Sequence, residues 1–577
     1  MLNNKQQVTI TLLFIAALLA LYVHPVYDPD FWWHLRAGQW IWQHKQVPSA
    51  DPFSFTTYEG LTGSQGDRVR YILTQYWLSQ PVFYISWKWL GPAGVIFLRA
   101  GILLASVMAV FRFLLKRSVS FFLALSLSAL AGLHLVVFTG ERPQLFSFFF
   151  AAVYLYGLES LRQRQSGPDG NSPSTSEHRK GLPGLLPFFL PFLTLLWANM
   201  HSSALMAWPI GVLYLFDALL SSFRRPDGRK RLLPFIGVVI ASLAVTFLNP
   251  NGFKVLPLLI NLSHTRHIQM NTEFMSPIEQ LAQMKIFHPA FWLLVLVSSV
   301  MLFSRKMTLL HRSLLLGLIL LSLSAVRFTP FFVLLSAMLI GPGLREIAET
   351  NRKRLSYLLI AATLSIFISH MYAYKDELFT PAGQLDKDYP KAAVEFIRDK
   401  KIRGRMFNLF EWGGYLIWHL PEVKTFVDGR VLRLDVYDEY DHIMISPQSP
   451  PYWKEVFDKY RIDFVLTAGV RTNLIYLLVG DPQWSPVYAD EVAIIFVKNP
   501  GGLEVLSGEM VLDTLIRSLR GLTEKNPDSP EALARLAGAY YHKKDNQNAL
   551  LYYKKAFAAN PDDPFLLNMI QLLEGRQ

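Results

Sequence analysis

Long apolar runs recur along the first two thirds of the chain, and short polar stretches separate them. Eleven runs come close to the ~20 residues that a helix needs to cross a bilayer. They cover residues 8–23, 93–115, 119–138, 142–160, 183–200, 203–220, 232–248, 289–303, 308–325, 328–343 and 355–372. The pattern predicts a polytopic α-helical membrane protein with about 11 transmembrane helices, in a domain at residues 1–372.

The first run also has features of a signal peptide. Lys5 is the only charge before it, however, and no clear small-residue cleavage site follows it before Asp28. We therefore expect the run to be kept as the first span.

A polar and aromatic stretch, DPDFWWHLRAGQW, follows the first run at residues 28–40. Tryptophan and tyrosine favour the interface between membrane and water, so this stretch is expected at a membrane face, in an outer loop at 24–92. Residues 74–90 are also apolar, but they contain Pro81 and Lys88 among many aromatic residues. We interpret them as a helix lying in the interface.

Under this interpretation, a series of basic residues along the membrane part falls in the loops of one side. They are Lys5, Arg112, Lys116, Arg117, the basic residues of 162–180, Arg224 to Arg231, Arg305, Lys306, Arg345 and Arg352 to Arg354. The positive-inside rule makes that side cytoplasmic and places the C-terminal part outside the inner membrane. If 74–90 crossed the bilayer, every later basic loop would lie outside instead.

The opposite face collects polar motifs of unusual content. Besides the first outer loop they are GERPQ at 140–144, WANMHSS at 197–203, the loop at 248–274 and AVRFTP at 325–330. Polar, non-helical backbone at membrane depth is tolerated mainly where it lines a cavity. Loops are also polar simply because they are wet, but these loops carry Asn, His, Gln and Arg beside aromatic residues. We expect them to form a site.

After the last run the pattern changes to alternating strands and helices. Candidate strands are 405–410, 424–428, 463–468 and 492–498, and candidate helices are 390–400 and 450–460. Residues 373–504 are therefore predicted to form a soluble α/β domain. GGYLIWHL at 413–420 lacks the spacing of a phosphate-binding loop, and we assign it a packing role.

The tail at 505–577 resembles a tetratricopeptide repeat, TPR. The dipeptide Asn-Pro at 526–527 recurs at 560–561, an offset that matches the 34-residue period of that repeat. Such repeats usually bind a protein partner. A single repeat cannot bury its own core, so we expect it to pack on the α/β domain or on another protein.

The amino-acid composition limits which ligands and reactions the chain can support. Only 17% of the 577 residues are charged, and the net charge of +12 lies largely in loops between apolar runs, so it does not indicate nucleic-acid binding. The chain has no cysteine. Disulfides, thiolate catalysis and cysteine-ligated metals are therefore excluded.

Two carboxylates are the catalytic candidates. Asp30, or alternatively Asp28, would be partly desolvated at the interface, which favours a role as proton acceptor. Guanidinium groups match phosphate oxygens, so the candidates for binding a donor phosphate are Arg327, Arg142, Arg99 and Arg266. Arg99 lies inside a span, where it could instead extend toward the outer headgroups.

Other polar residues of the outer face could contact a substrate. They are His34, Trp33, Gln144, Asn199, His201 and Glu273. The acids could also form a metal site with His264 and His267, but no close ligand spacing supports it, and we expect no metal or other cofactor.

An Asp-bearing first outer loop, an interfacial helix in that loop and about eleven spans resemble the GT-C superfamily of polyprenyl-phosphate-sugar-dependent glycosyltransferases, which includes protein O-mannosyltransferases and aminoarabinose transferases. More narrowly, the chain resembles a bacterial membrane glycosyltransferase family with outer α/β and tetratricopeptide parts. The motifs of this narrower resemblance are DPDFWWHLRAGQWI, PSADPFSF, ERPQLFSF, WANMHSS, LNPNG, VRFTPFF, FNLFEWGGYLIW and VDGR. The mannosyltransferase pattern has Asp-Glu in the first loop, whereas Phe31 follows Asp30 here. The resemblance implies transfer of a sugar from a polyprenyl-phosphate carrier to an acceptor hydroxyl at the outer face of the membrane, with inversion.

Two other functions remain open on the sequence. A non-enzymatic scaffold would recruit envelope partners through the TPR-like tail. A transporter is less favoured, because no pair of broken helices appears in matching halves.

Overall fold

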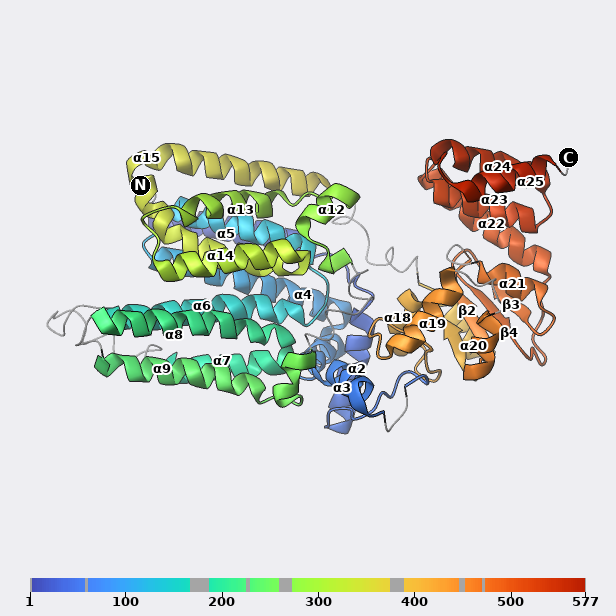
Figure 1. The fold of residues 1–577 in the computed structure, drawn as a ribbon, viewed down its shortest axis with the longest axis horizontal. Helices are drawn as coiled ribbons and strands as arrows, with labels where there is room; N and C mark the ends of the chain where they lie inside the picture. The colour runs from blue at the N-terminus through green and yellow to red at the C-terminus, as the bar shows by residue number, and fades with distance from the viewer. Residues whose placement is uncertain are drawn as a thin grey trace. The chain divides into compact units, whose positions relative to one another are not determined.

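The structure is a computed structural model that describes residues 3–57, 61–166, 186–224, 229–258, 272–373, 389–445, 452–469 and 473–575. The chain divides into two compact units. The first unit comprises residues 1–49 and 70–382, and the second comprises residues 50–69 and 383–577. Figure 1 shows long helices in the first unit and a small sheet with surrounding helices in the second.

Apolar helices make up the first unit, and a helix lies at each of the eleven predicted spans. The helices are α1 (Asn4–Tyr22), α4 (Ser79–Lys116), α5 (Phe121–Leu135) with η1 (Val136–Phe138), α6 (Gln144–Ser166), α7 (Leu186–Met200), α8 (Ala207–Arg224), α9 (Arg229–Ala244), α13 (Pro289–Leu302), α14 (Leu309–Ser324) and α15 (Thr329–Ala373), which covers the last two spans. Within the described residues, six helices are long and apolar enough to cross a membrane, or seven if a bent pair at 232–258 is one span. The helical membrane fold is thus confirmed, while the count of eleven stays a prediction.

The predicted interfacial helix at 74–90 is not a separate element. The structure has α3 (Gly63–Thr74), and α4 then begins at Ser79 and continues into the second predicted span. Gly91 interrupts α4 with a φ of 59° and a ψ of −146°, a conformation open to glycine, and Pro92 follows it. The helix therefore changes direction where the sequence predicts that the interfacial segment ends.

The second unit has a four-stranded mixed sheet in the order β1-β2-β4-β3. Its strands are β1 (Met406–Asn408), β2 (Phe464–Thr467), β3 (Ser485–Ala489) and β4 (Ile494–Val497). Strands β1 and β2 run parallel, whereas β4 is antiparallel to both of its neighbours. Helices α17 (Lys391–Asp399) and α20 (Tyr452–Tyr460) lie close to the predicted positions. The sequence analysis did not predict strand β3, because Ser485 and Pro486 are residue types typical of turns.

The predicted strand at 424–428 is wrong. Thr425 forms a single bridge with Ser54, which comes from the segment 50–57 of the first outer loop. The Thr425 amide donates to the Phe53 carbonyl at 3.1 Å, and the Phe55 amide donates back to the Thr425 carbonyl at 3.2 Å. Residues 50–69, which the sequence analysis placed in the membrane domain, thus belong to the second unit.

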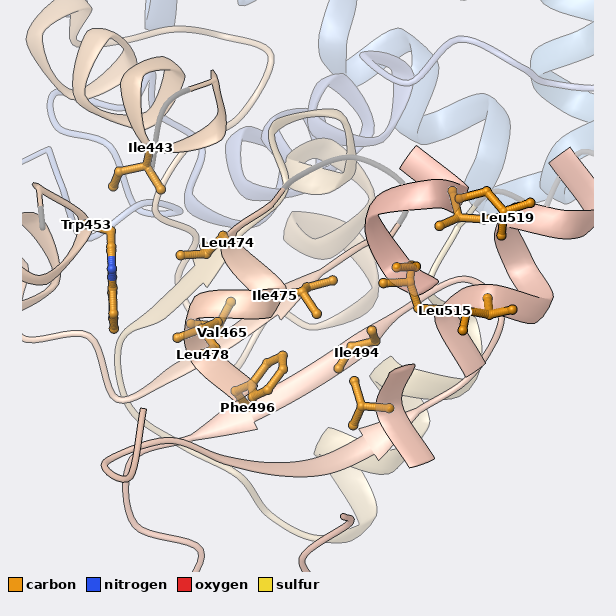
Figure 2. Close-up of a cluster of buried hydrophobic side chains, with 14 of the residues drawn as sticks. Ile443, Trp453, Val465, Leu474, Ile475, Leu478, Ile494, Phe496, Leu515 and Leu519 are labelled. Atoms are coloured by element: carbon orange, nitrogen blue, oxygen red, sulfur yellow. The ribbon is translucent and has the colours of Figure 1, made fainter. Parts of the chain in front are cut away.

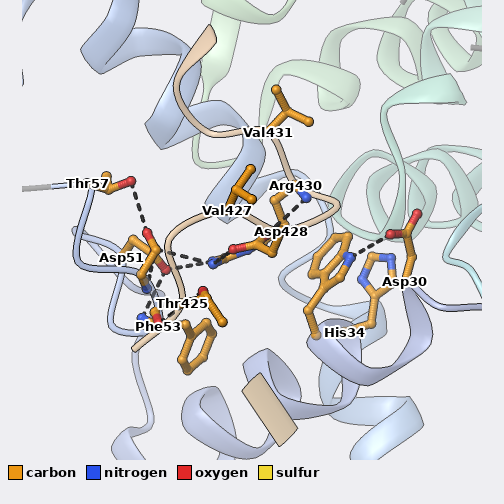
Figure 3. A network of polar contacts seen from close by, with 12 residues as sticks. Asp30, His34, Asp51, Phe53, Thr57, Thr425, Val427, Asp428, Arg430 and Val431 are labelled. Atoms are coloured by element: carbon orange, nitrogen blue, oxygen red, sulfur yellow. Dashed lines mark hydrogen bonds and ion pairs between the residues drawn. The ribbon is translucent and has the colours of Figure 1, made fainter. Parts of the chain in front are cut away.

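Arg430 fixes this segment in place (Figure 3). Its Nη1 lies 2.6 Å from Asp51 Oδ1, and its Nε lies 2.7 Å from Asp428 Oδ1. All three side chains are almost fully buried. Burial alone would lower the pKa of Arg430, but Asp428 and Asp51 raise it above its ordinary value. The VDGR motif therefore has a structural role in this unit.

GGYLIWHL forms helix α18 (Gly413–His419). A Cβ at Gly413 would collide with the backbone of Asp428, so glycine permits the close approach of the two segments. This contact agrees with the packing role that we expected from the sequence.

One hydrophobic core joins the sheet to the C-terminal helices. Figure 2 shows Val465 of β2 and Phe496 of β4 in the same cluster as Leu515 and Leu519. The last two lie on α22 (Gly508–Lys525), which α23 (Pro530–His542), α24 (Asn546–Ala559) and α25 (Pro564–Glu574) follow, each helix packing on the next. The tail thus packs on the α/β part, as expected, while its assignment to the TPR family remains a prediction.

Candidate active site

The loop between α1 and α2 (Phe31–His44) presents the two aspartates differently. Asp28 Oδ1 accepts the backbone N–H of Asp30 at 2.9 Å, and its carbonyl accepts the N–H of Phe31 at 3.1 Å. These bonds turn the chain at Pro29 and start α2. The aromatic face of α2 is then buried, mainly against α4, which fixes the direction of the Asp30 side chain.

Arg142, from the loop before α6, joins three carboxylates of the first unit. Its Nε lies 2.6 Å from Asp28 Oδ2, its Nη2 lies 3.2 Å from Asp30 Oδ2, and its Nη1 lies 2.7 Å from Glu273 Oε1. Three carboxylates from two of the predicted outer loops are thus brought together around an arginine from a third. Every nitrogen of the guanidinium faces a carboxylate, so in this arrangement Arg142 is engaged mainly by these acids.

A second, deeper ion pair supports the loop. Arg99 is fully buried, pairs with Glu141 and donates to the carbonyl of Tyr22 at 3.0 Å. The backbone N–H of Asp28 in turn donates to Glu141 Oε2 at 3.3 Å. Burial raises the pKa of the Glu141 carboxyl, and Arg99 opposes this effect. Arg99 therefore holds the end of α1 and has no access to a donor phosphate, contrary to our expectation.

Exposure separates Asp28 from Asp30. The Asp28 side chain is 7% exposed and lies against Gly140, where a Cβ would overlap its Oδ2. The Asp30 side chain is 23% exposed, with the indole Nε1 of Trp33 donating to its Oδ1 at 3.1 Å (Figure 3). Asp28 thus has a supporting position, and Asp30 is the one that a substrate could reach.

The surroundings of Asp30 suit a proton acceptor. Burial, the largest effect, raises the pKa of its carboxyl to about 6, and the charges of Asp28 and Glu273 act in the same direction. Arg142 and the Trp33 indole oppose the rise. A carboxylate with this pKa is ionised at neutral pH and still basic enough to take a proton from a hydroxyl in a transition state.

Tyr76 lies at the centre of the site, and the sequence analysis missed it. The His34 ring meets it edge-on at 5.2 Å between centroids, and the His201 ring stacks on it at 5.6 Å. Tyr76 also interacts electrostatically with Arg327, Arg142, Asp30 and Glu273. No motif distinguishes Tyr76 from its many aromatic neighbours in sequence, so only the fold could identify it.

The two histidines differ in their bonding. His201 Nδ1 accepts the backbone N–H of Ser203 at 3.1 Å, which leaves the ring proton on Nε2. Burial, together with Arg327, lowers the pKa of His201 to about 3, so the ring is neutral at ordinary pH and its Nε2–H can donate. His34 is buried, and its Nδ1 lies 3.3 Å from Gln80 Nε2.

Arg327 is the guanidinium that can receive an anion. It lies in η10 (Val326–Phe328), with its carbon 4.3 Å from the centroid of the Phe274 ring. Within the described part of the chain it makes no hydrogen bond or ion pair, yet it contributes to the electrostatics of Tyr76 and His201. Among the described residues, its donors are thus not engaged by an acceptor.

The other predicted residues lie elsewhere or are already bonded. The Asn199 side chain accepts from Trp77 Nε1 at 2.8 Å and donates to the carbonyls of Leu195 and Leu248, so its amide is a structural link rather than a sugar contact. Gln144 begins α6 and, within the described part of the chain, makes no hydrogen bond to the cluster around Arg142. Arg266 lies outside the described residues.

No metal-binding group is recognised among the described residues. Asp28, Asp30 and Glu273 do converge, but on the cation of Arg142. The two histidines proposed for the alternative metal site, His264 and His267, lie outside the described residues.

Comparison with solved structures gives several matches, including the two that follow. The oligosaccharyltransferase of Archaeoglobus fulgidus matches with a TM-score of 0.50 and 12% identity, over 81% of this chain and 69% of that one. ArnT from Cupriavidus metallidurans matches with a TM-score of 0.47 and 10% identity, over 85% and 97%. No protein-family model and no curated protein sequence matches the chain. The match to the oligosaccharyltransferase shows a shared fold, which agrees with the resemblance found in the sequence.

Proposed function

We propose that this protein is a membrane glycosyltransferase that moves a sugar from a polyprenyl-phosphate carrier to an acceptor hydroxyl. The GT-C-like fold supports the class of enzyme. The observation that carries the proposal is the position of Asp30, a partly exposed carboxylate whose pKa burial raises to about 6. Tyr76 interacts electrostatically with both Asp30 and Arg327, and Arg327 makes no hydrogen bond or ion pair within the described residues.

In the proposed reaction the acceptor oxygen attacks the anomeric carbon of the sugar, and Asp30 takes the proton of the acceptor hydroxyl. The bond between the anomeric carbon and the phosphate oxygen breaks, and its electron pair leaves with the polyprenyl phosphate. A single displacement inverts the anomeric configuration. Arg327 stabilises the negative charge that develops on the leaving phosphate.

The neighbouring groups prepare Asp30 for this role. Trp33 and Arg142 each bond one oxygen of the carboxylate and thereby restrict its orientation. Neutral His201 and the Tyr76 hydroxyl supply donors for sugar hydroxyls on the same side as Arg327. Of the four arginines that the sequence suggested for phosphate, the proposal keeps Arg327, while Arg142 and Arg99 hold the catalytic loop.

The distribution of basic residues favours a site outside the cytoplasmic membrane, with the N-terminus inside and the C-terminal unit outside. The donor would therefore be used after it has been flipped to the outer leaflet.

Cells that lack the chain and are complemented with variants test the proposal. Asp30→Asn should abolish the product in a mass profile of surface glycans and glycoproteins and should let the lipid-linked sugar accumulate, at unchanged protein abundance. Asp217→Asn is a matched control, since Asp217, on α8, is also 22% exposed and pairs with an arginine, Arg162, which lies near the end of α6 opposite to Arg142. A full glycan profile with Asp30→Asn would rule out this assignment of the base.

A non-enzymatic scaffold is the second candidate, and the packed helices α22 to α25 favour it. In that case removal of residues 505–577 should abolish the cellular phenotype, Asp30→Asn should have no effect, and the glycan profile should be the same with and without the chain.

A further inference from the structure

The second unit contains a cavity of about 470 Å³ that is separate from the cluster around Asp30. Its lining comes from η12 (Phe410–Trp412), α19 (Leu434–Ile445), the start of α21 (Leu474–Gly480) and α23. Its volume falls within the range of ligand-binding pockets.

Aromatic rings form one wall of the cavity. Phe410 and Tyr437 meet edge-on at 5.3 Å between centroids, and Tyr440 lies 6.3 Å from each of them. The Tyr440 hydroxyl accepts the backbone N–H of Phe410 at 2.9 Å, which fixes the wall. Tyr476, also in the lining, stacks on His542 at 3.9 Å. The electron-rich faces of such rings attract cations.

The polar groups of the lining include two carboxylates, from Glu411 and Asp441. Glu411 and Asp441 make no hydrogen bond or ion pair within the described part of the chain, and neither does the side chain of Asn473. The guanidinium of Arg535 instead bonds Glu531 at 2.6 Å. A sugar hydroxyl both donates and accepts, whereas ammonium and guanidinium groups only donate. Two unpaired carboxylates beside aromatic rings therefore match a cation better than a sugar.

We propose that this cavity binds a polypeptide segment by accepting one of its lysine or arginine side chains. A polypeptide is favoured over a small amine because Arg535 of α23 contributes to the lining, and α23 is one of four helices, α22 to α25, that pack consecutively. Stacked helices of this kind present extended surfaces to peptides. The inference goes beyond the transfer reaction and does not depend on it.

The test is a binding measurement on the full chain in a neutral polyoxyethylene detergent, which contains no sugar that could compete. The probe is a fluorescently labelled nonapeptide of glycine and serine with one central lysine, blocked at both ends. A peptide with norleucine in place of lysine keeps the alkyl chain and removes the charge. We expect the norleucine peptide to bind at least tenfold more weakly, and the affinity of the lysine peptide to fall as salt is added.

Variants locate the site. Glu411→Gln combined with Asp441→Asn should weaken binding of the lysine peptide at least tenfold. Asp438→Asn removes a charge from the same helix outside the cavity and should change it less than twofold. Unchanged thermal unfolding of each variant shows that the unit stays folded.

Asp30→Asn should bind the peptide like the unmodified chain. No sugar donor is present in this binding assay, so a negative result would not bear on the proposed sugar transfer. The proposal is overturned if the lysine and norleucine peptides bind equally, if neither binds at millimolar concentration, or if the double variant keeps full affinity. It is also overturned if a neutral disaccharide displaces the lysine peptide at lower concentration than lysine amide does.

Discussion

The Nη2 atom of Arg142 lies 3.2 Å from the Oδ2 atom of Asp30, and the same guanidinium contacts Asp28 and Glu273. This one cation balances three acids that would otherwise repel one another. Removing it with Arg142→Ala leaves them unneutralised, and we expect a loss of about 3 kcal/mol of stability together with loss of transfer.

Arg142→Lys keeps the charge but cannot contact three carboxylates with a rigid fork, so it should recover part of the stability and little of the activity. Thermal unfolding in detergent and the glycan profile measure the two effects. Unchanged stability of Arg142→Ala would contradict the assigned role.

The activity should depend on pH through Asp30. The base must be ionised, and burial raises its pKa to about 6. The rate should therefore be constant above pH 7 and fall about tenfold for each unit below pH 6. A pH profile of kcat/KM with the purified enzyme measures this, and a profile flat down to pH 4 would exclude Asp30 as the base.

The same shift predicts an effect on stability. The pKa of Asp30 is higher in the folded state than in the unfolded state, so ionisation of Asp30 at neutral pH opposes folding, and the cost disappears below pH 4. At pH 7 the Asp30→Asn variant should thus unfold at the same temperature as the unmodified chain or at a higher temperature. A marked decrease would show that the carboxylate is mainly structural.

Gly140 should not tolerate a side chain. A Cβ there would overlap Asp28 Oδ2, displace Asp28 and break its bond to Arg142. Gly140→Ala should therefore abolish transfer. Gly101→Ala is the matched control, since its Cβ meets nothing within 4 Å and alanine favours a helix by about 0.5–1 kcal/mol. Equal activity of the two variants would contradict this prediction.

Tyr76 allows the hydroxyl and the ring to be tested separately. Tyr76→Phe keeps the contacts with His34 and His201 and removes the hydroxyl, so stability should be unchanged and kcat/KM should fall about tenfold. Tyr76→Ala should lower both. If Tyr76→Phe has full activity, the hydroxyl does not contact the substrate.

The sequence predicted which loops form the site but not how their side chains pair. Asp30 and Arg142 were both candidates, because polar loops at one membrane face must line a common space. Asp28 and Asp30 flank one proline and cannot be distinguished by pattern. Only the fold shows that the first is buried against Gly140, while the second is partly exposed.

Pairing between distant residues explains the main errors. Arg99 looked like a phosphate ligand because its partner, Glu141, lies 42 positions away, and no local pattern connects them. Thr425 was predicted to lie in a strand because apolar residues alternate around it. Such alternation indicates burial, but it does not indicate which segment the residue pairs with. The segment 50–57 is polar and rich in turns, so its sequence did not indicate that it belongs to the second unit.

The segment around Asp51 has a consequence for biosynthesis. Its partner Arg430 follows 379 residues later, so the ribosome delivers the two at times that differ by roughly 20–80 s at ordinary elongation rates. During that interval Asp51 lacks the arginine that pairs with it, and the second unit cannot close. A folding factor would have its longest opportunity to act there, before the last quarter of the polypeptide emerges.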